Sequence, residues 1–151
     1  MTESGLRDHV GYWLRLLSDE VHASFERQLD ARGVTVAQWN VLVTVYHSQA
    51  TTTTEVARYI GIDPGAVSRL VDRLADKGLI ARLADPASRR RIQLSLTEAG
   101  RALVPDLIRI ADANDEAFFG ALPAGERVAL TRLLQNLLSA APSTAKEASH
   151  G

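Results

Sequence analysis

Hydrophobic side chains recur every three or four residues along most of this chain, which is the spacing that places them on one face of an α-helix. The first predicted helix, residues 5–31, shows this stripe most fully, at Leu6, Val10, Trp13, Leu17, Val21, Phe25 and Leu29. Apolar residues at helical spacing predict five further helices, at residues 36–47, 52–60, 63–77, 97–120 and 123–140. The fold is therefore expected to be mainly α-helical.

The third and fourth of these helices are joined by a short turn that carries clear end signals. Thr52 and Glu55 have the spacing of a capping box, in which the hydroxyl accepts from the third amide and the carboxylate reaches back to the cap. Gly61 provides the turn, because glycine takes a positive φ without a Cβ penalty. Asp63 caps the next helix and Pro64 occupies its first turn. The pattern predicts a helix-turn-helix.

A short β-hairpin is predicted directly after the second of these helices. Hydrophobic and polar residues alternate at residues 80–83 and 92–96, which is typical of strands. The predicted tip, residues 85–91, ends in three consecutive arginines. A two-stranded hairpin is marginal alone and must pack on neighbouring helices. A helix sized for the major groove beside a basic loop is a layout suited to DNA binding.

The distribution of charge supports a polyanionic partner for this segment. The whole chain of 151 residues has a net charge of −1. Residues 51–97, however, contain eight Lys or Arg against five Asp or Glu, a local charge of +3, which leaves −4 for the remainder. The local field around the basic segment matters more for binding than the total charge.

Several classes of protein are disfavoured by what the sequence lacks. No apolar run approaches the ~20 residues that span a bilayer, and no basic and apolar leader opens the chain, so a cytoplasmic protein without a membrane partner is expected. The absence of cysteine removes disulfides and thiolate metal sites. There is no glycine-rich phosphate loop, and the four histidines are scattered. We therefore expect no enzyme, no cofactor and no metal site.

The predicted helices near both ends of the chain are long and apolar on wide faces. They can form the core of a monomer, or two chains can bury them together in a homodimer. The dimer is favoured, because the helix-turn-helix and hairpin together, a unit of ~50 residues, cannot cover three such helices. A symmetric dimer would place two recognition helices about one DNA turn apart, which suits a palindromic operator.

These expectations divide the chain into four parts: an N-terminal dimerisation helix (1–34), a winged helix-turn-helix DNA-binding domain (35–97), C-terminal dimerisation helices (98–140) and a disordered tail (141–151). Pro105 lies well inside the fifth helix, where it predicts a kink or a local break.

Motifs in the central part of the chain resemble those of the multiple antibiotic resistance regulator (MarR) family. The similarity extends over about residues 5–140. It implies a dimeric winged helix-turn-helix transcription factor that binds double-stranded DNA, usually as a repressor, and that a small ligand often releases. The motifs are Asp63-Pro64-Gly65-Ala66-Val67-Ser68-Arg69-Leu70-Val71-Asp72-Arg73-Leu74, Lys77-Gly78-Leu79-Ile80, residues 85–91, and Leu94-Ser95-Leu96-Thr97-Glu98-Ala99-Gly100.

The resemblance also implies which residues contact DNA. Ser68 and Arg69 are the candidates for base edges, and Arg73 for phosphate. Gly65 and Ala66 stand where many relatives have Ser and Thr, so recognition is expected to shift toward phosphate contacts and DNA shape. The threonines that open the preceding helix can bind phosphate or act only as caps. The expected DNA-binding residues are Thr52, Thr53, Thr54, Pro64, Gly65, Ala66, Ser68, Arg69, Arg73, Arg89, Arg90 and Arg91.

The hairpin, or wing, departs from the family pattern at one position. Relatives commonly carry arginine where this chain has Ala87, whereas Arg89 and Arg90 match later arginines and Arg91 is additional. Asp85 is expected to brace the wing by pairing with one arginine, while another enters the minor groove, whose negative potential attracts arginine. The sequence leaves open which arginine enters.

An effector site is the least defined part of the prediction. Trp13, Trp39 and Tyr46 can line a pocket for a small aromatic or anionic effector, or they can be ordinary core residues. An alternative function also remains open: the chain can be a ligand-binding or interaction module that kept the winged-helix fold and lost specific DNA recognition. The unusual start of the recognition helix, Gly65 and Ala66, is the feature that favours this alternative.

Overall fold

The computed structural model describes residues 2–142, without the side chains of Arg89 and Arg90. Two compact units divide the chain, one ending at Asn114 and the next beginning at Asp115. None of the helices within the described range is long and apolar enough to cross a membrane. The elements are a 3₁₀ turn (Leu6–Asp8), α1 (Val10–Asp30), α2 (Val36–Tyr46), α3 (Thr53–Ile60), α4 (Pro64–Asp76), β1 (Ile80–Asp85), β2 (Ser88–Leu96), α5 (Glu98–Phe119) and α6 (Ala124–Ser139).

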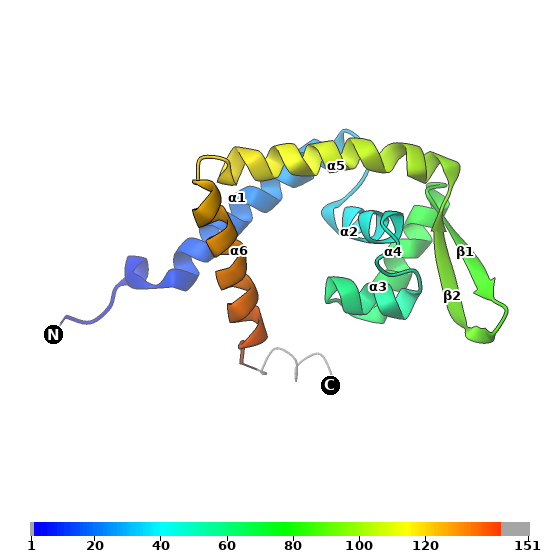
Figure 1. The fold of residues 1–151 in the computed structure, drawn as a ribbon, viewed down its shortest axis with the longest axis horizontal. Coiled ribbons are helices and arrows are strands. Elements are labelled where there is room, and N and C mark those ends of the chain that lie inside the picture. Colours follow the sequence, from blue (N-terminus) through cyan, green and yellow to red (C-terminus); the bar gives the residue numbers. More distant parts are fainter. Residues whose placement is uncertain (1, 143–151) are drawn as a thin grey trace. The chain divides into compact units, whose positions relative to one another are not determined.

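The first unit is built around one hydrophobic core that lies between the helices and the hairpin. Figure 1 shows α2, α3 and α4 gathered beside the β1–β2 hairpin. Every one of these elements, together with α1 and α5, contributes side chains that are removed from water, and this burial is the main favourable term in folding. Fully or almost fully buried are Leu29, Val41, Leu42, Val56, Val67, Val71, Leu74, Ile80, Leu94, Val104 and Leu107.

The turn between α3 and α4 follows the predicted end signals. Gly61 has φ 86°, in the left-handed region. Asp63 caps α4, with its carboxylate accepting from the Ala66 amide at 3.3 Å. Thr52 caps α3 as predicted, with its hydroxyl accepting from the Glu55 amide. The second bond of the predicted capping box differs, because the Glu55 carboxylate accepts from the Thr51 amide rather than from the Thr52 amide. A helix-turn-helix is confirmed.

The hairpin is longer than predicted and its arginines lie elsewhere. β1 and β2 are antiparallel, with Ala84 opposite Ile92 and Asp85 opposite Ser88. Arg89, Arg90 and Arg91 therefore occupy an irregular stretch of β2 rather than the tip. The alternation rule failed here because the three charged residues carry no period-two signal, although their backbone is extended.

A third segment pairs with the hairpin and was missed by the sequence analysis. The Leu94 amide donates to the Thr51 carbonyl at 2.7 Å, and Thr52 forms an isolated antiparallel bridge with Gln93. The start of α3 is thus attached directly to the wing. A bridge of one or two residues is too short to leave a periodic pattern.

The beginning of α5 packs closely on the segment that follows α4. The Thr97 hydroxyl donates to the Gly78 carbonyl at 2.6 Å, and the Thr97 amide donates to the Leu79 carbonyl at 3.1 Å. Thr97 also caps α5 by accepting from the Gly100 amide, as predicted. α5 then continues through Pro105 without interruption, so the expected local break is not present.

One buried polar residue joins α1 to α5. Asn114 is 4% exposed, and its carbonyl accepts from the Ser24 hydroxyl at 2.7 Å and from the Gln28 amide at 3.0 Å. Its own amide donates to the Val21 carbonyl at 3.2 Å. Because a buried amide costs free energy unless its bonds are made, this arrangement favours a single pairing of the two helices. α1 itself begins at Val10, later than predicted, because residues 6–8 form the 3₁₀ turn.

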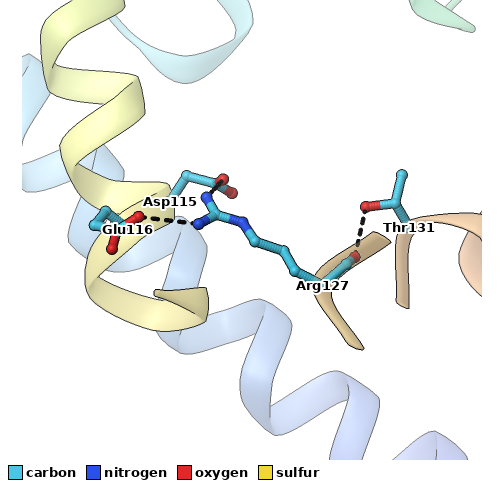
Figure 2. Close-up of polar contacts among 4 residues, drawn as sticks. All are labelled: Asp115, Glu116, Arg127 and Thr131. Atoms are coloured by element: carbon cyan, nitrogen blue, oxygen red, sulfur yellow. Dashed lines mark hydrogen bonds and ion pairs between the residues drawn. The ribbon is translucent and has the colours of Figure 1, made fainter. Parts of the chain in front are cut away.

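In the second unit, an arginine of α6 forms ion pairs with two acidic residues near the end of α5. Figure 2 shows Arg127 between Asp115 and Glu116, at 2.5 Å and 2.9 Å. Hydrogen bonding to Glu116, and next to Asp115, raises the pKa of Arg127, so its charge is constant over the physiological range. The apolar residues of α6 remain largely exposed: Val128, Leu133, Leu134, Leu137 and Leu138.

The contact between α5 and the segment after α4 predicts a cost for any side chain at Gly100. A Cβ there would collide with the Leu79 carbonyl oxygen, which is backbone and cannot turn away. Gly100→Ala should lower the free energy of unfolding by about 1–3 kcal/mol, despite the better helix propensity of alanine. Gly11→Ala, in α1 with no atom near the new Cβ, should be neutral or stabilising by up to about 1 kcal/mol. Urea denaturation of both variants checks this, and equal effects would contradict it.

Candidate nucleic-acid interface

Helix α4 has a buried face and a polar exposed face, as the sequence predicts for a recognition helix. Val67, Val71 and Leu74 are buried on its inner side. Ser68, Arg69 and Arg73 are exposed. The dimensions of an α-helix allow such a polar face to enter the major groove, where base edges and phosphates are within reach of its side chains.

The flank of α4 that faces the wing brings together half of the twelve predicted DNA-binding residues. A hollow of about 230 Å³ lies there, between the start of α3, the start of α4 and β2. Amide, hydroxyl and guanidinium groups are the donors that bind phosphate oxygens and sugars. The residues that line the hollow are Thr52, Thr53, Thr54, Pro64, Ser68, Arg91 and Ile92.

The opposite flank of α4 holds the other predicted arginines. A hollow of about 320 Å³ lies between α4, the start of α2 and the α3–α4 turn. Arg69 and Arg73 line it with Ala66, beside the apolar residues Ile62 and Leu70. Pro64 and Ser68 thus lie on one flank of α4, and Ala66, Arg69 and Arg73 lie on the other.

The three threonines at the start of α3 have different surroundings. Thr52 is 4% exposed and its hydroxyl accepts from the Glu55 amide at 3.2 Å, so its side chain serves as a cap. Thr54 is exposed and Thr53 is half-buried. A phosphate contact from either of these two stays a prediction.

The unusual Gly65 has a local physical reason. A Cβ at this position would lie 2.8 Å from the Asp63 carboxylate that caps α4, and 3.6 Å from the Arg69 guanidinium. A serine here would force the capping carboxylate to move. The absence of a side chain at Gly65 therefore leaves room for the carboxylate of Asp63, which caps α4 two residues earlier.

An ion pair between α4 and the wing was missed by the sequence analysis. Arg82 of β1 bonds to the carboxylate of Asp72 on α4. Both side chains are substantially exposed, so the pair contributes little to stability. The two residues are ten positions apart in different elements, and no spacing rule connects them.

Asp85, the predicted wing brace, has a contact within the hairpin turn. Asp85 accepts a hydrogen bond from the Ala87 amide at 2.9 Å, which closes the hairpin turn. The side chains of Arg89 and Arg90 lie outside the described part of the chain, so pairing of Asp85 with either arginine stays a prediction, as does insertion into the minor groove. Arg91 is exposed on β2.

The aromatic residues predicted for an effector pocket have separate contacts. Trp39 meets Phe25 edge to face, with ring centroids 5.9 Å apart, and packs with Tyr46 against the core. Trp13 is half-exposed on α1 and donates its indole N–H to the Arg7 carbonyl at 2.9 Å. The core contacts explain Trp39 and Tyr46, and a pocket formed by the three residues stays a prediction.

Comparison with known proteins points to one class of regulators. The MarR family model matches residues 34–92. The HTH-type transcriptional repressor NicR of Pseudomonas putida is 29% identical over 137 residues, which are 91% of this chain and 87% of NicR.

Two solved structures extend the similarity over almost the whole chain. Bordetella bronchiseptica BpsR, whose DNA binding is regulated by 6-hydroxynicotinic acid, is 31% identical with a TM-score of 0.82, covering 90% of this chain and 97% of that one. A mutant of Escherichia coli MarR in complex with operator DNA is 25% identical with a TM-score of 0.78, covering 85% and 93%.

The wing-side hollow predicts a phosphate or groove contact from Arg91. Arg91→Ala should weaken binding to duplex DNA and reduce the slope of log affinity against log salt by about 1, because one fewer counterion is released. Arg101→Ala, at an exposed position on α5, removes the same charge away from this surface and should leave the slope unchanged. Fluorescence anisotropy across a salt series measures both slopes. An unaltered slope for the Arg91 variant would remove this residue from the interface.

Proposed function

This chain belongs to the MarR family, and we propose that it is a homodimeric transcriptional repressor that binds a palindromic DNA operator and responds to a small ligand. The observation that carries the proposal is the meeting of three elements at one hollow: the threonines of α3, Ser68 of α4 and Arg91 of the wing. Groups that donate hydrogen bonds converge there beside an exposed recognition helix.

The polar face of α4 supports reading of DNA sequence rather than simple attraction to its charge. Ser68 and Arg69 are exposed next to each other, and a guanidinium can bind the O6 and N7 atoms of guanine together. Arg73 lies one turn farther along the helix, where it suits a phosphate contact. These roles are proposals by analogy with the family.

Exposed apolar side chains on the terminal helices support the homodimer. On α1 and the turn before it they are Leu6, Val10, Trp13, Leu14 and Leu17, and on α6 they include Leu137 and Leu138. Isolated exposed leucines are ordinary, but whole helical stripes of them mark surfaces that another chain covers. A second copy of this chain meets that need, and its two-fold symmetry matches a palindromic operator.

A small aromatic or anionic effector is proposed from the relatives. BpsR responds in its DNA binding to 6-hydroxynicotinic acid, which has both properties. A ligand that binds better to one arrangement of the recognition helices than to another shifts the dimer toward that arrangement. We infer further that the protein works in the cytoplasm and is not an enzyme, since its relatives are transcription regulators.

Specific recognition predicts a large difference between operator and random DNA. In vitro selection from a random duplex library should enrich a palindromic site, and affinity for this site should exceed that for random duplex by a factor on the order of 10³ or more at physiological salt. Equal affinity for both duplexes would instead support the alternative function, a ligand-binding or interaction module with the same fold.

The proposed dimer predicts that charge on α6 separates the two chains. Leu137 is 65% exposed, and burial of such a side chain contributes roughly 1.5–3 kcal/mol, from each of the two chains. Leu137→Glu should therefore shift the protein toward monomer. Leu83→Glu, at a similarly exposed leucine of the wing (56%), should remain dimeric. Sedimentation velocity at micromolar concentration distinguishes the two, and a fully dimeric Leu137 variant would place the interface elsewhere.

A further inference from the structure

Lys77, the residue after α4, reaches across to the turn that ends α1. Its ammonium donates to the Gly33 carbonyl at 2.5 Å and to the Gln38 side-chain carbonyl at 2.8 Å. Gly33 lies in the left-handed turn between α1 and α2, with φ 69°. One cation therefore joins the end of the recognition helix to the α1–α2 turn and to α2.

The acceptor of the second bond is held firmly. Gln38 is 3% exposed, and its carbonyl oxygen also accepts from the Thr35 amide at 3.2 Å, as part of the capping box of α2. The Thr35 hydroxyl accepts in return from the Gln38 amide at 3.1 Å. Lys77 thus bonds to an oxygen that is already held by burial and by the α2 capping box.

The position of Lys77 distinguishes this contact from ordinary core packing. Val67, Val71 and Leu74 already fix α4 to the core, whereas Lys77 is exposed and adds no apolar burial beyond its stem. What it joins is the α1–α2 turn, and α1 carries the exposed apolar stripe that a second chain is proposed to cover. The contact therefore lies between the end of the DNA-reading helix and the α1–α2 turn, which connects α2 to the helix proposed for dimerisation.

We propose that Lys77 is a positioning residue that sets the separation of the two recognition helices in the dimer, and through it the spacing of the operator half-sites. The inference rests on the proposed function. Bonds to a charged donor are stronger than neutral ones, and the Gln38 acceptor is buried, so rotation of α4 about its buried side is restricted at this end. A dimer with a fixed separation accepts one half-site spacing, and a looser dimer accepts several.

The experiment measures affinity against half-site spacing. The half-site selected by the wild-type protein is placed twice in a duplex, at centre-to-centre separations from about 8 to about 13 base pairs. Wild-type protein should prefer one separation and bind a duplex longer or shorter by one base pair on the order of tenfold more weakly. Lys77→Met keeps the aliphatic stem without the donors, and it should reduce this contrast to about threefold or less.

Two control variants distinguish loss of the Lys77 hydrogen bonds from loss of a positive charge and from a general change in structure. Arg101→Met removes an exposed positive charge from α5 and should keep the wild-type contrast. Lys77→Arg keeps a charged donor and should retain most of the contrast. The base preference within each half-site should be the same in all three variants, because the reading face of α4 is untouched.

Each outcome decides the question. A Lys77→Met protein with the wild-type spacing contrast would overturn the proposal, and so would one that lost its half-site base preference together with the contrast. If wild-type protein enriched no paired half-sites, the proposed function itself would fail. Should the methionine variant not fold, Lys77→Gln, whose shorter side chain cannot span both bonds, carries the same test with the same expected loss.

Discussion

The carbonyl oxygens of Gly78 and Leu79, just past the recognition helix, accept hydrogen bonds from Thr97 at the start of α5. Gly100 packs so closely on the Leu79 backbone that a Cβ has no place there. On the other side of the same segment, Lys77 bonds to the turn that ends α1. The consecutive residues 77–79 therefore connect the DNA-reading helix to the start of α5 and to the turn that follows α1. This segment therefore couples the direction of α1 and α5 to the end of α4, whose inner side chains are held in the core.

The recognition helix α4 belongs both to the hydrophobic core and to the surface proposed to bind DNA. Its inner side chains belong to the hydrophobic core, and its outer side chains stand between two hollows, one toward the wing and one toward α2. The ion pair of Arg82 with Asp72 and the bridge of Thr52 with Gln93 attach the wing to the same body. Hairpin and helix thus form one surface for the proposed DNA contact, and the proposed response to a ligand would act on how two such surfaces are spaced in the dimer.

Local signals in the sequence predicted the elements, because caps, turns and periodicity are encoded by neighbouring residues. Thr52, Gly61, Asp63 and Thr97 act at helix ends as expected. The errors lie where distant segments decide the structure. Arg89–Arg91 have extended backbone within β2 at a register shift of the hairpin, and α5 continues unbroken through Pro105. For the site, the resemblance supplied the residues, but only the fold shows Arg91 and Ser68 at one hollow, and the contacts of Lys77 and Arg82 join segments that no spacing rule connects.

Whether the segment after α4 fixes the recognition helix to the helices proposed for dimerisation is tested most directly by the distance between the two recognition helices in solution. Because the chain has no cysteine, Asp76→Cys at the exposed end of α4 gives one spin label per chain and one label pair per dimer. Double electron–electron resonance on the DNA-free dimer should give a single narrow distance distribution, which broadens when Lys77→Met is added. A broad distribution already present with Lys77 intact, in a protein that is fully dimeric, would contradict the account.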